Sequence, residues 1–166
     1  MKTIEFEIPK GFEIDKEKTT KSKIILKYIE KQFVDLGLPS GTLWANKTEE
    51  GYYTYDEAIE KFQDSLPTIV DFAELVQYCK WKWQEKGMLV TGPNGNSITL
   101  PALGYRSSDS GALGNVGSDG CCWSASPYPS SSSDAYNLNF NSNGNVYPAN
   151  NNLRSYGFSV RCIKRK

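Results

Sequence analysis

Few side chains in this sequence are suited to catalysis. There are four cysteines, Cys79, Cys121, Cys122 and Cys162, and no histidine. Without an imidazole, the chain lacks the usual general base, the partner that activates serine or cysteine nucleophiles, and a common ligand of catalytic zinc. We therefore expect no enzymatic activity.

The spacing of the cysteines also argues against a metal or redox site. No two of them have the CxxC spacing of such sites. Cys121 and Cys122 are adjacent, and neighbouring side chains of a strand point to opposite faces, so the two thiols cannot easily bind one ion. We expect small buried thiols, with no metal and no cofactor.

The glycine-rich residues 92–97, Gly-Pro-Asn-Gly-Asn-Ser, invite comparison with a phosphate-binding loop. The segment lacks the Gly-Lys-Ser/Thr ending of such loops, and no helical pattern follows it. Because Asn94-Gly95 favours the positive φ angles of a tight turn, we predict a hairpin with strands at 88–90 and 98–100.

The charge pattern argues against several kinds of partner. Lys+Arg and Asp+Glu are balanced at 19 each, so we expect no nucleic-acid partner. No apolar run approaches the roughly 18 residues of a membrane span, so we expect no membrane insertion. The first residues contain no apolar signal-peptide core, which predicts synthesis in the cytoplasm without a signal peptide.

The C-terminal third is rich in asparagine, serine and tyrosine. This composition is typical of antibody paratopes, in which tyrosine supplies contact area with few rotors and the small polar residues adapt their hydrogen bonds. We predict a recognition surface that draws on Tyr128, Ser130 to Ser133, Asn137, Asn139, Asn141, Asn143, Asn145, Tyr147, Asn150 to Asn152 and Tyr156.

Periodicity predicts the elements that carry this surface. Tyr136, Leu138 and Phe140 alternate with asparagines, and residues 158–162 show the same period of two, so we predict two strands with one buried face each. Residues 142–156 between them hold almost no side chain that could be buried. We predict a solvent-facing loop there.

Two amphipathic helices are predicted earlier in the chain, each with a capping box at its start. The boxes pair Thr54 with Glu57 and Thr68 with Asp71. The apolar spacing of the second helix continues to Trp83, and Gly87 is its predicted C-cap.

Three of the four tryptophans are interpreted as packing residues, namely Trp44, Trp83 and Trp123. The role of Trp81 stays open between packing and a ligand platform.

Residues 1–33 are predicted to form a separate β segment. Ile4, Phe6 and Ile8 alternate with glutamates in one predicted strand, and residues 22–30 form a second. Two strands alone are marginally stable in water, so the segment must dock on the main domain or on a partner. An extension of the core sheet and a dedicated adaptor both remain open.

Several separated motifs resemble the fibrobacter-type major paralogous domain. They are residues 34–45 (VDLGLPSGTLWA), 66–68, 90–97, 100–106, 123–124 and 156–162 (YGFSVRC). That group is related to formylglycine-generating-enzyme-like and C-type-lectin-like folds, and the match covers residues 34–163. The resemblance implies an α+β, C-type-lectin-like fold over residues 34–166, with two helices packed on short antiparallel strands and long ordered loops.

The Asn-rich block, residues 121–162, resembles the variable region of proteins that diversity-generating retroelements mutate, such as phage tropism determinants. The resemblance implies a fixed scaffold that includes Trp123, Tyr136, Leu138, Phe140, Gly157, Phe158, Val160 and Arg161. It implies ligand-binding, variable positions at Cys121, Ala125, Pro127, Tyr128, Asp134, Asn145, Tyr147, Leu153, Ser155 and Tyr156.

The function implied is recognition of a protein or glycan receptor by a phage or prophage protein. Residues 1–33 would attach it to a homo-oligomer or a larger assembly such as a virion. Two alternatives stay open: a carbohydrate-binding module, in which Trp81, Tyr128 and Tyr147 would stack on sugars, and a structural subunit of a surface or virion assembly. The catalytic cysteine pair of formylglycine-generating enzymes has no evident counterpart, so that activity is not expected.

Overall fold

The computed structural model describes residues 8, 12–20, 26–28 and 31–166. The chain divides into two compact units, Met1–Lys31 and Gln32–Lys166. In the first unit, β1 (Phe12–Ile14) pairs antiparallel with β2 (Leu26–Tyr28). The strand predicted at residues 4–8 lies outside the described residues except for Ile8, which is exposed.

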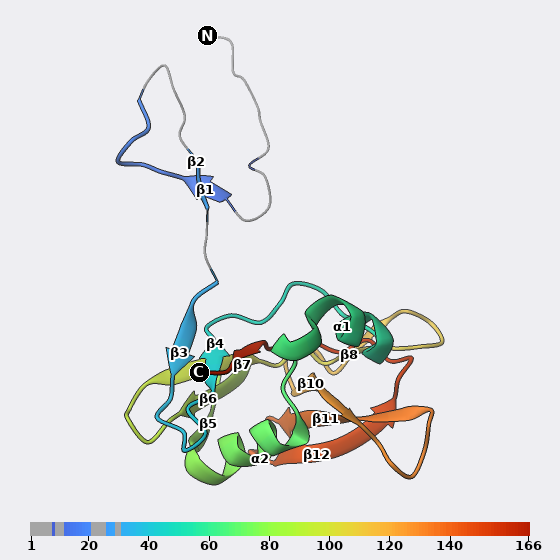
Figure 1. Cartoon of the computed structure of the whole chain (residues 1–166). Coiled ribbons are helices and arrows are strands. Elements are labelled where there is room, and N and C mark those ends of the chain that lie inside the picture. The colour runs from blue at the N-terminus through green and yellow to red at the C-terminus, as the bar shows by residue number, and fades with distance from the viewer. Residues whose placement is uncertain (1–7, 9–11, 21–25, 29–30) are drawn as a thin grey trace. The chain divides into compact units, whose positions relative to one another are not determined.

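The structure is mostly β-sheet, which corrects the expected fold class (Figure 1). Strands make up 42% of it and helices 14%, with two short α-helices and several small antiparallel sheets. The expected α+β, C-type-lectin-like fold with two helices packed on short antiparallel strands is therefore wrong.

The second helix is shorter than its apolar spacing predicts. Helix α2 (Ile69–Tyr78) stops at Cys79, whose φ of −99° and ψ of 156° are extended. Residues Lys80–Gln84 (KWKWQ) form strand β5, paired with β6 (Gly87–Thr91). Trp81 and Trp83 thus follow the period of a strand, and both pack partly against the core. The predicted helical extension to Gly87 is wrong.

The predicted helix starts are confirmed. Helix α1 (Tyr55–Phe62) begins at Thr54, and α2 begins at Thr68. In both capping boxes, the threonine side chain accepts from the third backbone N–H of the helix and the acidic side chain accepts from the cap residue's own N–H. A short 3-10 turn, η1 (Gln63–Ser65), connects the two helices.

The strands form small antiparallel sheets in the second unit. The predicted hairpin is confirmed, because β6 pairs with β7 (Ser97–Pro101) around Asn94 and Gly95. The other strands of this unit are β3 (Phe33–Asp35), β4 (Leu43–Ala45), β8 (Tyr105–Arg106), β9 (Leu113–Gly114), β10 (Asp119–Pro127), β11 (Asp134–Asn141), β12 (Val146–Leu153) and β13 (Ile163–Lys164). Their sheet orders are β13-β4-β3, β5-β6-β7, β8-β9 and β10-β11-β12.

Strand β12 corrects the loop predicted at residues 142–156. It pairs antiparallel with β11, and its residues alternate between half-buried and exposed. Backbone pairing with β11 stabilises an asparagine-rich segment that few apolar contacts would hold. The remaining residues of the predicted loop form the tight turn before β12 and the segment after it.

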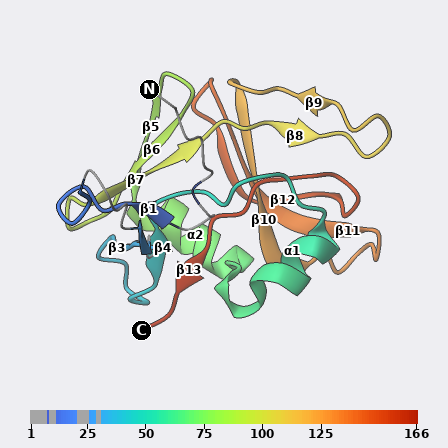
Figure 2. The same ribbon diagram turned by 90° about the horizontal axis from the view of Figure 1, so that it is seen from above.

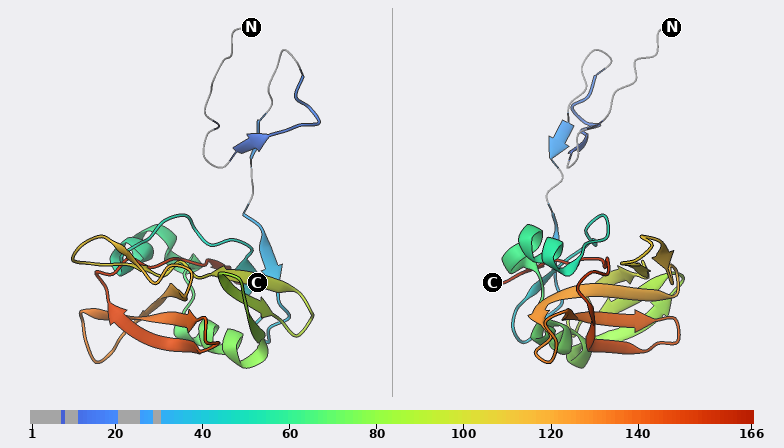
Figure 3. Two further views of the ribbon diagram at one scale, coloured as in Figure 1. Left: turned by 180° about the vertical axis from the view of Figure 1, so that it is seen from behind. Right: turned by 90° about the vertical axis from the view of Figure 1, so that its right-hand side faces the viewer.

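The sheet β10-β11-β12 separates two apolar clusters. Cys122, Leu138 and Phe140 face a cluster that includes Phe72 and Leu75 of α2. Cys121, Trp123 and Ala135 belong to a second cluster with Tyr55 and Ala58 of α1. Accordingly, the two helices lie on opposite sides of this sheet (Figure 3). The adjacent cysteines face opposite clusters, as the strand period predicts.

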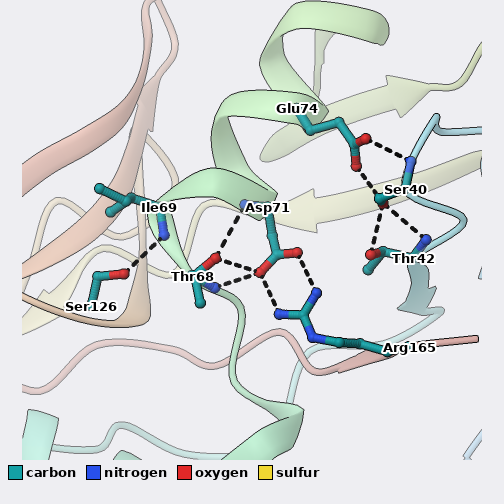
Figure 4. Close-up of polar contacts among 8 residues, drawn as sticks. All are labelled: Ser40, Thr42, Thr68, Ile69, Asp71, Glu74, Ser126 and Arg165. Atoms are coloured by element: carbon teal, nitrogen blue, oxygen red, sulfur yellow. Dashed lines mark hydrogen bonds and ion pairs between the residues drawn. The ribbon is translucent and has the colours of Figure 1, made fainter.

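Helix α2 is held in place by polar contacts with three distant segments (Figure 4). Arg165 donates two 2.9 Å hydrogen bonds to the Asp71 carboxylate. Glu74 accepts from the backbone N–H of Ser40 at 2.8 Å and from its hydroxyl at 2.6 Å. The backbone N–H of Ile69 donates to the Ser126 hydroxyl of β10 at 3.2 Å. Helix α2 is therefore fixed to the β3–β4 turn, to β10 and to the C-terminal tail.

A buried arginine ties two further strands together. Arg161 is 1% exposed and donates to the carbonyl of Ala45 at 2.7 Å and to the carbonyl of Thr99. Burial lowers the pKa of its guanidinium to about 10, so the group is still charged at neutral pH. Arg161 thus belongs to the scaffold.

Candidate binding site

A pocket of about 400 Å³ opens on the face of β10-β11-β12 that carries Cys121. It draws on all three strands, on the β8–β9 hairpin and on the segment after β12. Figure 2 shows that hairpin beside the sheet. The residues that line the pocket are Tyr105, Asn115, Asp119, Cys121, Asn139, Tyr147, Asn150, Asn152, Tyr156 and Phe158.

A β-bulge shapes the floor of the pocket. Asn137 in β11 pairs with Asn150 in β12, whereas Asn139 pairs with Tyr147. Two steps along β11 therefore match three steps along β12, so β12 contains one extra residue at Pro148–Ala149. In a regular strand Tyr147 and Asn150 would face opposite sides. The bulge brings both to the pocket, and Asn152 follows on the same face.

Aromatic rings from separate segments form one wall. Tyr105 of β8 meets Tyr156 edge to face, with centroids 5.6 Å apart. Tyr156 in turn stacks near Phe158, with centroids 6.1 Å apart and planes 22° apart. The backbone of Arg106 exchanges hydrogen bonds with Gly157 at 2.8 and 2.9 Å, which fixes the two segments side by side.

The amide groups of the floor are partly committed to neighbours. The Asn139 Nδ2 donates to the Cys121 Sγ at 3.3 Å, and the Asn152 Nδ2 donates to the Asn137 Oδ1 at 3.0 Å. The Asn115 Nδ2 donates to the Asp119 Oδ2 at 2.6 Å. Each of these three amides keeps a second N–H donor, and its oxygen accepts no hydrogen bond from the described residues.

The electrostatic character of the lining is weakly acidic. Asp119 carries the single formal charge among the lining residues, and none of them is lysine or arginine. The phenols of Tyr105, Tyr147 and Tyr156 make no hydrogen bond within the described chain. The pocket therefore offers oxygen acceptors, hydroxyl groups and aromatic faces.

The one thiol in the pocket is poorly suited to nucleophilic chemistry. Cys121 is 5% exposed, and burial raises the pKa of its thiol to about 12. The hydrogen bond from Asn139 acts in the opposite direction but does not offset the effect of burial. A thiolate is the reactive form of cysteine, so this group is almost entirely in its unreactive form at neutral pH. What the arrangement can do is bind a polar ligand.

Three of the ten predicted site residues line the pocket: Cys121, Tyr147 and Tyr156. Ala125 lines a different pocket of about 700 Å³, together with Leu66 and Ile163. The other predicted residues lie outside both pockets: Pro127, Tyr128, Asp134, Asn145, Leu153 and Ser155.

Several of these outlying residues have local roles. Tyr128 packs edge to face on Tyr136 at 5.2 Å. The Asp134 carbonyl accepts from the Arg154 Nε at 3.1 Å. Neither Tyr128 nor Trp81 lines the pocket with Tyr147. The three-residue sugar platform of the carbohydrate alternative is not assembled in this pocket.

The other seven lining residues were not among the predicted site positions. Asn139, Asn150 and Asn152 belong to the asparagine-rich set, and strand alternation could have selected Asn139. Regular alternation from Tyr147 would place Asn150 and Asn152 on the opposite face of β12, and the bulge brings them to the same face as Tyr147. Four more come from outside that set, and no sequence signal joins them to it: Tyr105, Asn115, Asp119 and Phe158.

Two general features of the described residues complete the site. Among the described residues, no three His, Cys, Asp or Glu side chains are grouped so that they could hold a metal ion. No helix in the part of the chain that the structure describes has the length and apolar character needed to cross a bilayer.

Comparisons with known proteins give one match. Neither the curated proteins nor the solved structures contain a match to this chain. One family model, described as "Domain of unknown function (DUF8237)", matches residues 81–163. This range is half of the chain, runs from β5 to the start of β13 and contains every residue of the pocket. The chain therefore belongs to the DUF8237 family.

Proposed function

We propose that this chain is a non-catalytic binding protein whose recognition site is the pocket on β10-β11-β12. The observation that carries the proposal is the convergence of amide, phenol and carboxylate groups from distant segments into one pocket of about 400 Å³. Ligand sites fall in the range of about 300–1,000 Å³ and place a few polar groups among aromatic ones.

The packing around the pocket supports a preformed site. The sheet has apolar clusters on both faces, and Trp123, Leu138 and Phe140 are fully buried. A stiff sheet fixes the lining side chains before a ligand arrives, which lowers the entropy lost on binding. Tyr147 is 50% exposed at the pocket, so it is available to a partner.

The same arrangement supports the proposal that the region is diversified by a retroelement. Tyr147, Asn150 and Asn152 lie on an edge strand, and none of the three is a buried core residue. Replacing them changes the pocket and leaves the apolar clusters intact. The neighbouring DNA tests this idea. A reverse transcriptase gene beside a near-copy of the coding sequence that differs at adenines is expected, and its absence contradicts diversification.

We extend the proposal to the setting of the protein. Residues 1–33 act as the attachment segment of a larger assembly, and a phage or prophage virion is the setting that the sequence resemblance implies. The compact unit Met1–Lys31 is compatible with such a segment.

A selection experiment tests the binding function. The wild-type chain is used to select ligands from a displayed peptide library and from a glycan array. Each selected ligand is then measured against the double variant Tyr147→Ala/Asn150→Ala. A matched control, Ser132→Ala/Asn143→Ala, removes exposed polar groups that do not line the pocket.

We expect the pocket variant to weaken binding at least tenfold and the control to leave it unchanged. Thermal unfolding of both variants should match the wild type within a few degrees. If the selections give no ligand, or if every ligand binds the pocket variant as well as the wild type, the proposed function is wrong.

A further inference from the structure

We infer that the pocket receives the guanidinium group of an arginine side chain presented by a protein partner. This inference rests on the proposed function and names the chemistry of the ligand. Three properties of the pocket lead to it: the excess of oxygen acceptors, the charge of the lining and the aromatic wall.

The floor and the near wall offer more acceptors than donors. The Nδ2 groups of Asn139, Asn152 and Asn115 each use one of their two N–H donors on a protein atom, whereas their Oδ1 atoms accept no hydrogen bond from the described residues. The Asp119 carboxylate adds further lone pairs. Acceptor lone pairs therefore outnumber the free N–H donors of the lining, which favours a ligand rich in hydrogen-bond donors. A guanidinium has five N–H donors and no acceptor.

Charge selects a cationic donor over an anionic ligand. Asp119 is half-buried and is the charged residue of the lining, with no lysine or arginine beside it. A carboxylate and a guanidinium form charge-assisted hydrogen bonds that are roughly twice as strong as neutral ones. A phosphate or carboxylate ligand would meet the Asp119 charge without any basic side chain in the lining to offset it.

The aromatic wall suits a flat cation. Tyr105, Tyr156 and Phe158 form a connected set of rings, and Tyr147 adds a fourth ring. Guanidinium groups stack favourably on aromatic faces.

The surroundings of the pocket point to a protein as the carrier of the arginine. Leu113 of β9 and Val116, which follows Asn115 in the connection to β10, are 54% and 56% exposed. Tyr147 on the floor strand is 50% exposed. Exposed apolar and aromatic side chains beside a polar pocket are typical of protein interfaces, in which arginine is enriched at the centre.

A saccharide is the alternative ligand, and the donor count disfavours it. Sugar hydroxyls both donate and accept, so a sugar needs donors from the protein as well as acceptors. In this lining three of the four asparagines use one N–H donor on protein atoms, so the remaining donors are fewer than the acceptor lone pairs.

A titration with matched small probes tests the inference. Backbone and side-chain amide resonances of the full chain are followed by NMR during addition of N-acetyl-arginine methylamide. N-acetyl-citrulline methylamide, which has nearly the same shape and no charge, is the first control probe, and a methyl glycoside is the second. The variant Asp119→Asn removes the charge of the lining. Asp109→Asn, in the exposed loop between β8 and β9 and outside the pocket, is its matched control.

We expect the arginine probe to shift the Asn139, Asn150 and Asn152 side-chain amides, and citrulline to bind at least tenfold more weakly. Asp119→Asn should remove this preference, and Asp109→Asn should keep it. Equal binding of citrulline and arginine, binding of the glycoside alone, or no shift with any probe overturns the inference.

The ligands selected for the proposed function separate the two ideas. If a selected ligand loses affinity in Tyr147→Ala/Asn150→Ala but not in Asp119→Asn, the arginine inference fails and the binding function stands. If a selected peptide loses affinity in both variants and its arginine cannot be replaced by citrulline, both are supported. If no ligand responds to either variant, both fail.

Discussion

Tyr147 and Asn150 lie on the same face of β12 although they are three residues apart. The extra residue at Pro148–Ala149 makes this possible, because it reverses the alternation of side chains. Proline at this position suits a bulge on an edge strand, since it has no N–H to contribute to a ladder. The register of this strand therefore decides which side chains enter the pocket.

Deleting Ala149 is expected to abolish the bulge and move either Tyr147 or Asn150 out of the pocket. The affinity for ligands selected on the wild type should fall at least tenfold, measured by calorimetry. The apolar clusters do not contain Ala149, so the melting temperature should change little. Deleting Ser132, in the turn between β10 and β11, is the control and should keep the affinity. Unchanged binding after deletion of Ala149 would contradict the role of the bulge.

Gly120→Ala is expected to destabilise the fold. A β-carbon at Gly120 would lie 2.0 Å from the Cζ atom of Phe140, whose ring is fully buried. Overpacking of this kind costs about 1–3 kcal/mol in the free energy of unfolding, measured by urea denaturation. Adding Phe140→Leu should relieve the clash, so the double variant should lose less stability than the sum of the two single variants. Additive losses would show that the ring and the new methyl group do not meet.

The Asp71–Arg165 ion pair should make stability depend on pH in the acid range. Burial acts to raise the pKa of the Asp71 carboxyl, but hydrogen bonds from Arg165 and Thr68 outweigh it, so the pKa lies below the ordinary value of 3.8. A lowered folded-state pKa contributes stability that is present above 3.8 and is lost as the pH falls through the folded-state value. Denaturation curves at pH 7 and pH 3 should show this loss.

Arg165→Ala should reduce the free energy of unfolding by about 1–3 kcal/mol at pH 7, since hydrogen bonds to a charged group contribute that much. The difference from the wild type should shrink below pH 3.8. Lys166→Ala serves as a control, because the Lys166–Asp35 pair is exposed and should contribute little. An equal effect of both substitutions at pH 7 would contradict the importance of burial at Asp71.

Cys121 should resist alkylation in the folded protein. Burial raises the pKa of its thiol to about 12, so the thiolate fraction at pH 7.5 is below about one in 10⁴. Labelling by iodoacetamide, followed by mass spectrometry of the peptides, should be much slower for Cys121 in the native chain than in urea. The more exposed Cys79 is a useful comparison within the same molecule. Rapid native labelling of Cys121 would point to a reactive thiol in the pocket.

The elements that depend on neighbouring residues could be predicted from the sequence. The two capping boxes, the hairpin around Asn94-Gly95 and the alternation at Tyr136, Leu138 and Phe140 are local patterns, and the structure contains each of them. Caps and tight turns satisfy hydrogen bonds within a few residues, so they can be predicted from the local sequence without knowledge of the fold.

The remaining features depend on contacts between distant segments of the chain. Trp83 fits either a helix or a strand in its local spacing, and pairing with Met88 of β6 selects the strand. Backbone bonds to β11 turn the asparagine-rich segment around Asn151 into a strand that its side chains do not specify. The pocket joins Tyr105 to Asn152 across 47 residues of chain. Such contacts depend on pairing between distant segments. A short stretch of sequence does not specify which distant segment will pair with it.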